Sequence, residues 1–300
     1  MRTVDPTTIK DALMDTCGPG TSPRTRLVLE RLVHHLHAFA KEVDLSHEEW
    51  RLGIDLLTRA GEITDRERNE FVLFSDVLGL SSLVDMLHSP KDATPSSVLG
   101  PFHILGAPEI PSGGDLIGDN EGDHVAVIGA IRSTDRSPVA GAVMEIWQTA
   151  ANGLYSNQDT DQPEYNLRAR LKVGEDGRFC FTTVRPAPYT VPTDGPVGTV
   201  LGAMDRHPWR PSHLHLIVEA PGHRSLVTEL FPSDDPYLDE DAVYGVREAL
   251  VTEYVPRTST EDLPAELEAR ERLALPYFRV DFDISLARET EDQPREASRI

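Results

Sequence analysis

The spacing of apolar residues changes near residue 100, and this change constrains the fold of the 300-residue chain more than any other feature. Between residues 24 and 88, apolar side chains recur at three- and four-residue intervals, the period of amphipathic helices. Beyond Gly100, short runs rich in β-branched and aromatic residues are separated by Gly and Pro clusters, which is typical of strands and turns. The sequence therefore predicts helices followed by a β-sandwich.

The element boundaries follow from local signals. Ser46 and Glu49 have the spacing of a capping box, and Gly79 is a plausible break between two helices. Helices are expected over Thr25–Ala40, from Ser46 to Gly61, after Asp65, and over Leu80–Leu87. Strands are expected over Val125–Ile131, Ala142–Trp147, Arg178–Val184, His213–Val218, Leu226–Phe231 and Tyr277–Ile284.

These elements predict a mainly β fold with three parts. Residues 1–99 form an N-terminal helical domain, which we interpret as a dimerisation layer because it carries no evident chemistry. Residues 100–286 form an antiparallel β-sandwich, since many short strands with turns between them favour that architecture. Residues 287–300 are polar and charged and are expected to form a tail.

Composition excludes several classes of partner. A formal net charge of −21 makes nucleic acid an unsuitable partner, because phosphate binding needs Lys and Arg. No apolar run is long enough to span a bilayer, and no apolar segment follows the N-terminal residues as in a signal peptide. Only Cys17 and Cys180 are present, which suits a reducing cytoplasm better than a disulfide scaffold.

The strongest chemical signal is a pair of histidines in a predicted strand. Successive side chains of a strand point to opposite faces, so His213 and His215 point the same way and Leu214 points the other way. Two imidazoles held side by side can bind one metal ion. The pattern predicts a metal site in which other residues complete the ligand set.

Two tyrosines are candidate further ligands. Prolines stiffen the loop around Tyr189, and Tyr155 follows a glycine turn at Gly153. A free phenol has a pKa of about 10 and is a poor ligand at neutral pH unless a hard, highly charged cation deprotonates it. Two phenolates and two imidazoles would suit Fe(III) better than Mg²⁺ or Ca²⁺.

Taken alone, these residues leave other functions open. A packing role explains either tyrosine, and a non-catalytic sandwich module for binding or adhesion explains the Pro138–Ala142 turn without any chemistry. A zinc hydrolase is a further alternative, although the sequence contains no HExxH motif.

A family resemblance narrows these alternatives. Residues from about Ser96 to Val251 resemble the intradiol ring-cleaving dioxygenases, and the helical region resembles their N-terminal dimerisation domain. The matching segments are Pro95–Phe102, Pro138–Ala142, Glu145–Gln148, Gly153–Tyr155, Arg210–His215 and Ala220–His223. The resemblance implies an enzyme that binds a small aromatic diol or triol and O2, and a homodimer formed through the N-terminal helices.

The resemblance also implies roles for single residues. Four of them would hold non-haem Fe(III): Tyr155, Tyr189, His213 and His215. Tyr189 would leave the metal and take up a proton when substrate binds, and Arg210 would stabilise negative charge on the ring. A salt bridge with one of the many acidic residues is the alternative role of Arg210.

Within the family, the chain is most similar to enzymes that cleave hydroxyquinol (benzene-1,2,4-triol) to 3-hydroxy-cis,cis-muconate, a tautomer of maleylacetate. Catechol and chlorocatechol are alternative substrates. The implied substrate pocket consists of Leu73, Asp76, Val98, Leu99, Gly100, Pro101, Phe102, Val191, Pro192, Arg210 and Val243. Asp76 favours the triol, because catechol has no third hydroxyl to pair with a buried carboxylate, and an unpaired polar group costs about 1–3 kcal/mol.

One position departs from the pattern of many relatives. Glu229 stands in the expected strand Leu226–Phe231 where many catechol-cleaving relatives carry glutamine. A carboxylate there would affect the metal from outside the ligand set or point away from it. The sequence leaves the role of Glu229 open.

Overall fold

The computed structural model describes residues 4–65 and 68–289, and its contacts group the chain into two compact units, Met1–Arg59 and Ala60–Ile300. The helices α4 and α5, which fall within the predicted domain 1–99, thus belong with the sheets. The domain boundaries at 99 and 286 stay a prediction. Most of the predicted tail, residues 290–300, lies outside the described residues.

The first unit is helical and begins each long helix with a polar cap. It contains α1 (Ile9–Met14), α2 (Pro23–Glu42) and most of α3 (His47–Ile63). The Ser22 hydroxyl accepts the Thr25 N–H at the start of α2. Ser46 and Glu49 exchange both bonds of the capping box, at 2.9 and 3.2 Å, which confirms that prediction. Helix α1 was not predicted.

The second unit contains three further α-helices in its described part: α4 (Glu70–Val77), α5 (Leu80–His88) and α6 (Pro196–Ala203). Gly79 separates α4 from α5 with a φ of +75°, as predicted from the sequence. Helix α6 was missed. Its Val197 and Leu201 pack in one apolar cluster with Leu73, Val77, Val98, Val191 and Val243.

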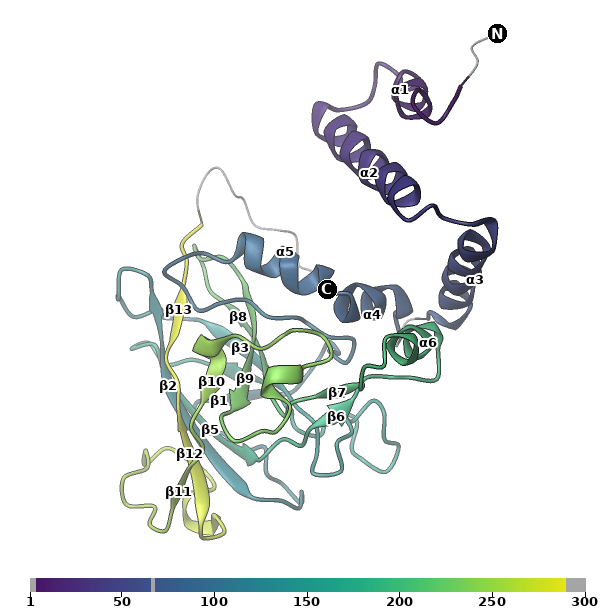
Figure 1. Ribbon diagram of the computed structural model, residues 1–300. Helices are drawn as coiled ribbons and strands as arrows, with labels where there is room; N and C mark the ends of the chain where they lie inside the picture. The colour runs from purple at the N-terminus through teal and green to yellow at the C-terminus, as the bar shows by residue number, and fades with distance from the viewer. Residues whose placement is uncertain (1–3, 66–67, 290–300) are drawn as a thin grey trace. The chain divides into compact units, whose positions relative to one another are not determined.

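Two large sheets form most of the rest of this unit (Figure 1). The first has the order β1 (Glu109–Pro111), β4 (Arg168–Lys172), β3 (Val143–Trp147), β8 (Leu214–Glu219), β9 (Leu226–Pro232) and β10 (Val251–Thr252). The second has the order β11 (Val255–Arg257), β12 (Tyr277–Asp281), β2 (His124–Ser133) and β13 (Ile284–Leu286), with β5 (Arg178–Val184) also paired to β2. Residues from both sheets share one buried core, which confirms the mainly β sandwich.

The sheets of this sandwich are mixed, with parallel as well as antiparallel strand pairs. The pairs β1–β4, β9–β10, β2–β12 and β2–β13 are parallel. These partners join from distant parts of the chain, and strands without a hairpin connection can pair in either direction. The expected single strand Tyr277–Ile284 is divided, because the Asp283 carboxylate accepts the Ala130 N–H and interrupts the ladder on β2.

Strand β8 faces two different environments. Leu214, Leu216 and Val218 lie in the core between the sheets, whereas His215 and Ile217 lie on the opposite face. Ile217 packs there with residues that include Phe102 and Tyr189. In the described residues no single helix is long and apolar enough to cross a membrane, while α4 and α5, bent by 72°, pass that test together.

Two glycines of α6 give a matched test of packing. A Cβ on Gly198 would lie 1.9 Å from the Thr193 carbonyl oxygen, whereas one on Gly202 would meet nothing within 4 Å. We expect Gly198→Ala to lower the free energy of unfolding by about 1–3 kcal/mol through overcrowding. Gly202→Ala should be neutral or raise it by up to about 1 kcal/mol. Denaturant unfolding measures both, and equal stability of the two variants would contradict this packing.

Candidate metal centre

Strand register places three side chains in a row on one face of the first sheet. His215 lies opposite Trp147 on β3 and opposite Glu229 on β9. Directly opposite residues of antiparallel strands share a face, so all three side chains point the same way. The Trp147 and His215 rings are stacked, with centroids 4.6 Å apart and planes 4° apart.

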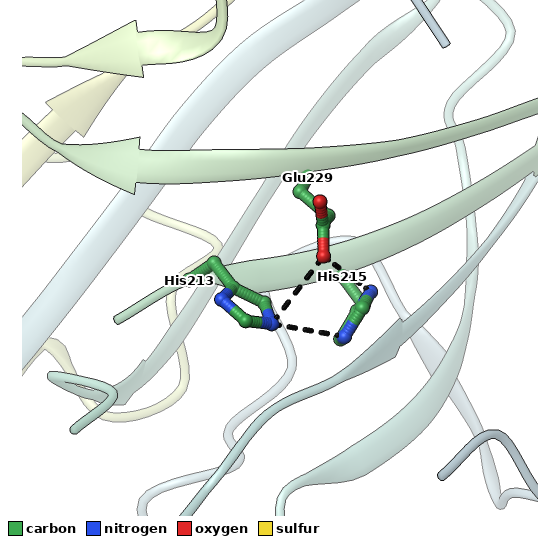
Figure 2. A group of neighbouring side chains, drawn as sticks. All are labelled: His213, His215 and Glu229. Atoms are coloured by element: carbon green, nitrogen blue, oxygen red, sulfur yellow. Dashed lines mark hydrogen bonds and ion pairs between the residues drawn. The ribbon is translucent and has the colours of Figure 1, made fainter. Parts of the chain in front are cut away.

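The two histidines present nitrogens to each other. The His213 Nδ1–H donates to the Pro211 carbonyl at 2.7 Å, which leaves the Nε2 lone pair free in the neutral ring. That Nε2 lies 3.0 Å from the His215 Nε2 (Figure 2). Burial, followed by the charge of Arg210, lowers the pKa of His213 to about 3. Burial likewise holds the pKa of His215 well below its usual value, so both rings are neutral.

Tyr155 reaches the same point from a loop. Its hydroxyl lies 3.3 Å from the His213 Nε2, and its backbone N–H donates to the Gln158 side chain. The turn before it needs Gly153, which has a φ of +79° and lies so close to Pro188 that a Cβ would be 3.2 Å from that carbonyl oxygen. The loop is therefore fixed against the segment that carries the second tyrosine.

Tyr189 comes from a two-stranded ribbon of β6 (Tyr189–Thr190) and β7 (Trp209–Arg210), in which it pairs with Arg210. The Arg210 Nη1 lies 3.4 Å from the Tyr189 hydroxyl oxygen. Burial raises the pKa of both phenols, and that of Tyr155 well above its usual value. A phenolate at either position would therefore need a bound cation to stabilise it.

Arg210 and Glu229 form a buried ion pair beside the histidines. The guanidinium bonds both carboxylate oxygens of Glu229, at 2.9 and 3.1 Å, and also bonds Asp241. Glu229 Oε1 lies 3.4 Å from His213 Nε2 and 3.4 Å from His215 Nδ1, as drawn in Figure 2. His213, His215 and Glu229 are thus a group whose candidate ligand atoms lie within 4.8 Å of one another.

The donor set fits a metal ion. Ligand nitrogens lie about 2.0–2.1 Å from a metal such as zinc, so two nitrogens 3.0 Å apart can reach one ion. His213 Nε2 is also within 3.3 Å of the Tyr155 hydroxyl, and Tyr189 lies close to Tyr155, with ring centroids 5.4 Å apart. The structure thus brings together the four side chains that the sequence analysis nominated, and their role as ligands stays a prediction.

A small cavity lies next to this group. Tyr189 lines it together with ten of the eleven residues of the implied substrate pocket: Leu73, Asp76, Val98, Gly100, Pro101, Phe102, Val191, Pro192, Arg210 and Val243. The eleventh, Leu99, instead packs against the aromatic cluster that contains Phe102, Trp147 and both tyrosines. Burial raises the pKa of Asp76 to about 6. That these residues contact substrate stays a prediction.

Sequence reasoning missed several supports of the site. Ser97 donates to Glu229, Asp241 bonds Arg210, and Arg168 donates to Ser156 next to Tyr155. The Asp241 carboxylate accepts the backbone N–H groups of Val243 and Gly245. An Asp shortly before a Gly is a sequence signal for such a turn, and it could have indicated Asp241. Ser97 and Glu229 are 132 positions apart in the sequence, so no local signal could have indicated the role of Ser97.

Comparisons with known proteins support one family. A family model described as "Dioxygenase" matches residues 110–286, and one described as "Catechol dioxygenase N terminus" matches residues 22–95. The 6-chlorohydroxyquinol 1,2-dioxygenase of Cupriavidus pinatubonensis is 44% identical over 86% of this chain and 94% of that protein. The hydroxyquinol 1,2-dioxygenase of a Rhizobium species is 45% identical over 77% of this chain and 80% of that protein.

A solved structure agrees with these relatives. The hydroxyquinol 1,2-dioxygenase from Pseudomonas putida superimposes with a TM-score of 0.84 at 42% identity, over 95% of this chain and 99% of that one. The two family models together span most of the chain, and the matches cover 94% and 80% of the two relatives. The chain therefore belongs to the family of intradiol ring-cleavage dioxygenases.

Proposed function

We propose that this chain is a non-haem Fe(III) enzyme that cleaves hydroxyquinol between adjacent hydroxyls with O2. The product would be 3-hydroxy-cis,cis-muconate, a tautomer of maleylacetate, with both oxygen atoms of O2 incorporated. The observation that carries the proposal is the buried convergence of two imidazoles and two phenols beside a small cavity. The relatives named as hydroxyquinol and 6-chlorohydroxyquinol 1,2-dioxygenases support the substrate.

Four residues would hold the metal: Tyr155, Tyr189, His213 and His215. When bound, a ferric ion would activate the ring diolate toward O2. Tyr189, as a phenolate, is the side chain suited to take up a proton from substrate, because it lines the cavity. The Arg210 N–H that faces Tyr189 would stabilise negative charge there and on the ring. The apolar walls formed by Leu73, Phe102 and neighbouring residues would exclude water.

Asp76 would distinguish the triol from catechol. It is 3% exposed and lines the cavity, where its carboxylate can accept a hydrogen bond from a third ring hydroxyl. Catechol has no third hydroxyl to donate to that carboxylate, which then keeps only the hydrogen bond with Ser81. Catechol and chlorocatechol remain the alternative substrates. The description of the N-terminal family model, "Catechol dioxygenase N terminus", favours catechol of the two.

Functions of other classes fit the site less well. A non-catalytic sandwich module gives no reason to bury two histidines, two tyrosines and an arginine around one point. A zinc hydrolase would use histidine and carboxylate ligands, and Glu229 is near the histidines. However, both oxygens of Glu229 already bond Arg210. Metal analysis of the purified protein separates zinc from iron.

A tyrosine substitution tests the metal ligands. The iron-loaded protein should be coloured by phenolate-to-iron charge transfer, and Tyr155→Phe should lower the iron content at least about tenfold, because it removes a ligand. Tyr254→Phe is the matched control, since the Tyr254 hydroxyl is buried and has no hydrogen-bond partner among the described residues. Metal analysis and visible absorption measure both. Equal iron content in the two variants would remove Tyr155 from the ligand set.

The pH dependence of substrate preference tests Asp76. Burial raises its pKa to about 6, Glu229 and Asp85 act in the same direction, and Ser81 and Arg210 oppose it. Raising the pH through 6 ionises the carboxylate and makes it a stronger acceptor. The ratio of kcat/KM for hydroxyquinol to that for catechol should therefore rise across this range. It should be lower and independent of pH in Asp76→Asn, whereas Glu70→Gln, on the same helix, should keep the rise.

We also propose that the protein is a cytoplasmic homodimer. Both cysteines are free thiols, and burial raises the pKa of Cys180 to about 11. No residue of α2 is buried. Leu32, Leu36 and Phe39 lie about one helical turn apart and are 51–56% exposed, so the helix carries an uncovered apolar face. A second copy of the chain is the partner that would cover them.

Charge placed on this face tests the dimer. Sedimentation velocity should give twice the 33.2 kDa chain mass for the wild type. The variant Leu36→Glu/Phe39→Glu should sediment as a monomer, because burying two carboxylates in an apolar interface is costly. Leu105→Glu adds charge at another exposed leucine and should remain dimeric. Dimers of the double variant would show that a different surface associates.

A further inference from the structure

The proposed reaction assigns no role to Glu229, a carboxylate beside the candidate metal centre. Its side chain is 0% exposed, and β9 places it opposite His215. Burial of an ionised carboxylate costs several kcal/mol unless opposite charge and hydrogen bonds compensate for it. The groups that supply this compensation therefore indicate what the carboxylate does.

Arg210 is held between two carboxylates. A guanidinium has five N–H groups. Nη1 and Nη2 each donate to one oxygen of Glu229, at 2.9 and 3.1 Å, and Nε and Nη2 donate to the two oxygens of Asp241, at 3.0 and 3.3 Å. These bonds use four of the five. The remaining N–H is on Nη1, which lies 3.4 Å from both the Tyr189 hydroxyl oxygen and the His213 Nε2.

The surroundings are shaped for this arrangement. The Ser97 hydroxyl lies 2.5 Å from Glu229 Oε2 and 2.7 Å from the Gly245 carbonyl. A Cβ on Gly245 would lie 2.7 Å from Arg210 Nη2 and 2.8 Å from Glu229 Oε2, so a larger residue would push the pair apart. The Gly245 N–H also donates to Asp241 at 2.7 Å. Gly245 thus leaves room for the Arg210–Glu229 ion pair and also holds Asp241, the second carboxylate that binds Arg210.

We propose that Glu229 is a positioning residue that aims the free N–H of Arg210 at Tyr189, an inference that rests on the proposed function. Glu229 Oε1 lies 3.4 Å from each histidine, and both of its oxygens bond the guanidinium. Metal ligation by Glu229 would release Arg210 from one side. Without the Glu229 bonds, only Asp241 would hold the guanidinium, through Nε and Nη2. The group could then rotate, and the Nη1–H would no longer point at Tyr189.

The geometry predicts which substitutions disturb Arg210. Glu229→Gln keeps the shape but replaces one acceptor oxygen by an NH2 group, which repels the facing guanidinium N–H. Glu229→Asp keeps the charge but is one methylene too short to reach both Nη atoms. Glu70→Gln is the matched control, because Glu70 is also 0% exposed and bonds an arginine, Arg68, at 3.0 and 3.1 Å.

The experiment uses iron-loaded full-length protein with benzene-1,2,4-triol. In Glu229→Gln and Glu229→Asp we expect unchanged iron content, kcat lowered about tenfold to a hundredfold, and KM within about threefold of wild type, because the lost donor acts on developing charge. The charge-transfer band should move to longer wavelength as Tyr189 loses its donor. Glu70→Gln should keep kcat and the band. In an Arg210→Lys background, Glu229→Gln should change kcat less than about threefold.

A second measurement needs neither iron nor turnover. In the metal-free protein, ¹⁵N NMR of the arginine side chains should give an ordered Arg210 guanidinium in the wild type and in Glu70→Gln, and a mobile one in both Glu229 variants. Iron loss confined to the Glu229 variants would make Glu229 a ligand and overturn the inference, as would an unchanged kcat and guanidinium signal. A wild type without iron or turnover would overturn the proposed function instead, and the guanidinium signal would still decide the role of Glu229.

Discussion

The site depends on the alternation of strand β8 between two environments. Leu214, Leu216 and Val218 are buried between the sheets, and burial of each such side chain contributes about 1.5–3 kcal/mol. A slip of one residue would exchange the two faces and move all three out of the core between the sheets. Burial of these three side chains therefore fixes the position of His215, and the imidazole need not contribute binding energy of its own to hold the register.

Electrostatics then decide what this buried group is able to hold. Burial keeps His213 and His215 neutral and disfavours ionisation of Tyr155 and Tyr189, so the site without a cation carries protonated phenols. The nearest fixed positive charge, Arg210, is compensated by Glu229 and Asp241. A multivalent cation is consequently the species that makes ionisation of the phenols favourable.

The sequence was most informative where structure follows from local periodicity. The shared face of His213 and His215, the capping box at Ser46 and the break at Gly79 were all predicted from nearby residues. Partners across strands were not. The position of Glu229 opposite His215 depends on the register of β8 and β9, and that of Tyr189 opposite Arg210 depends on a ribbon of two-residue strands too short to carry a pattern. Asp283 divides an otherwise regular strand through a single hydrogen bond.

The parallel stack of Trp147 on His215 affects how quickly a metal can enter and leave. The His215 and Trp147 ring planes are only 4° from parallel. Rotation of the imidazole about its Cβ–Cγ bond would therefore break its stacking contact with the indole. The ring is therefore held in a single orientation before any ion arrives. Association need not wait for this ligand to reorient, and after dissociation the vacated nitrogen still faces the same point, so that rebinding is favoured over escape.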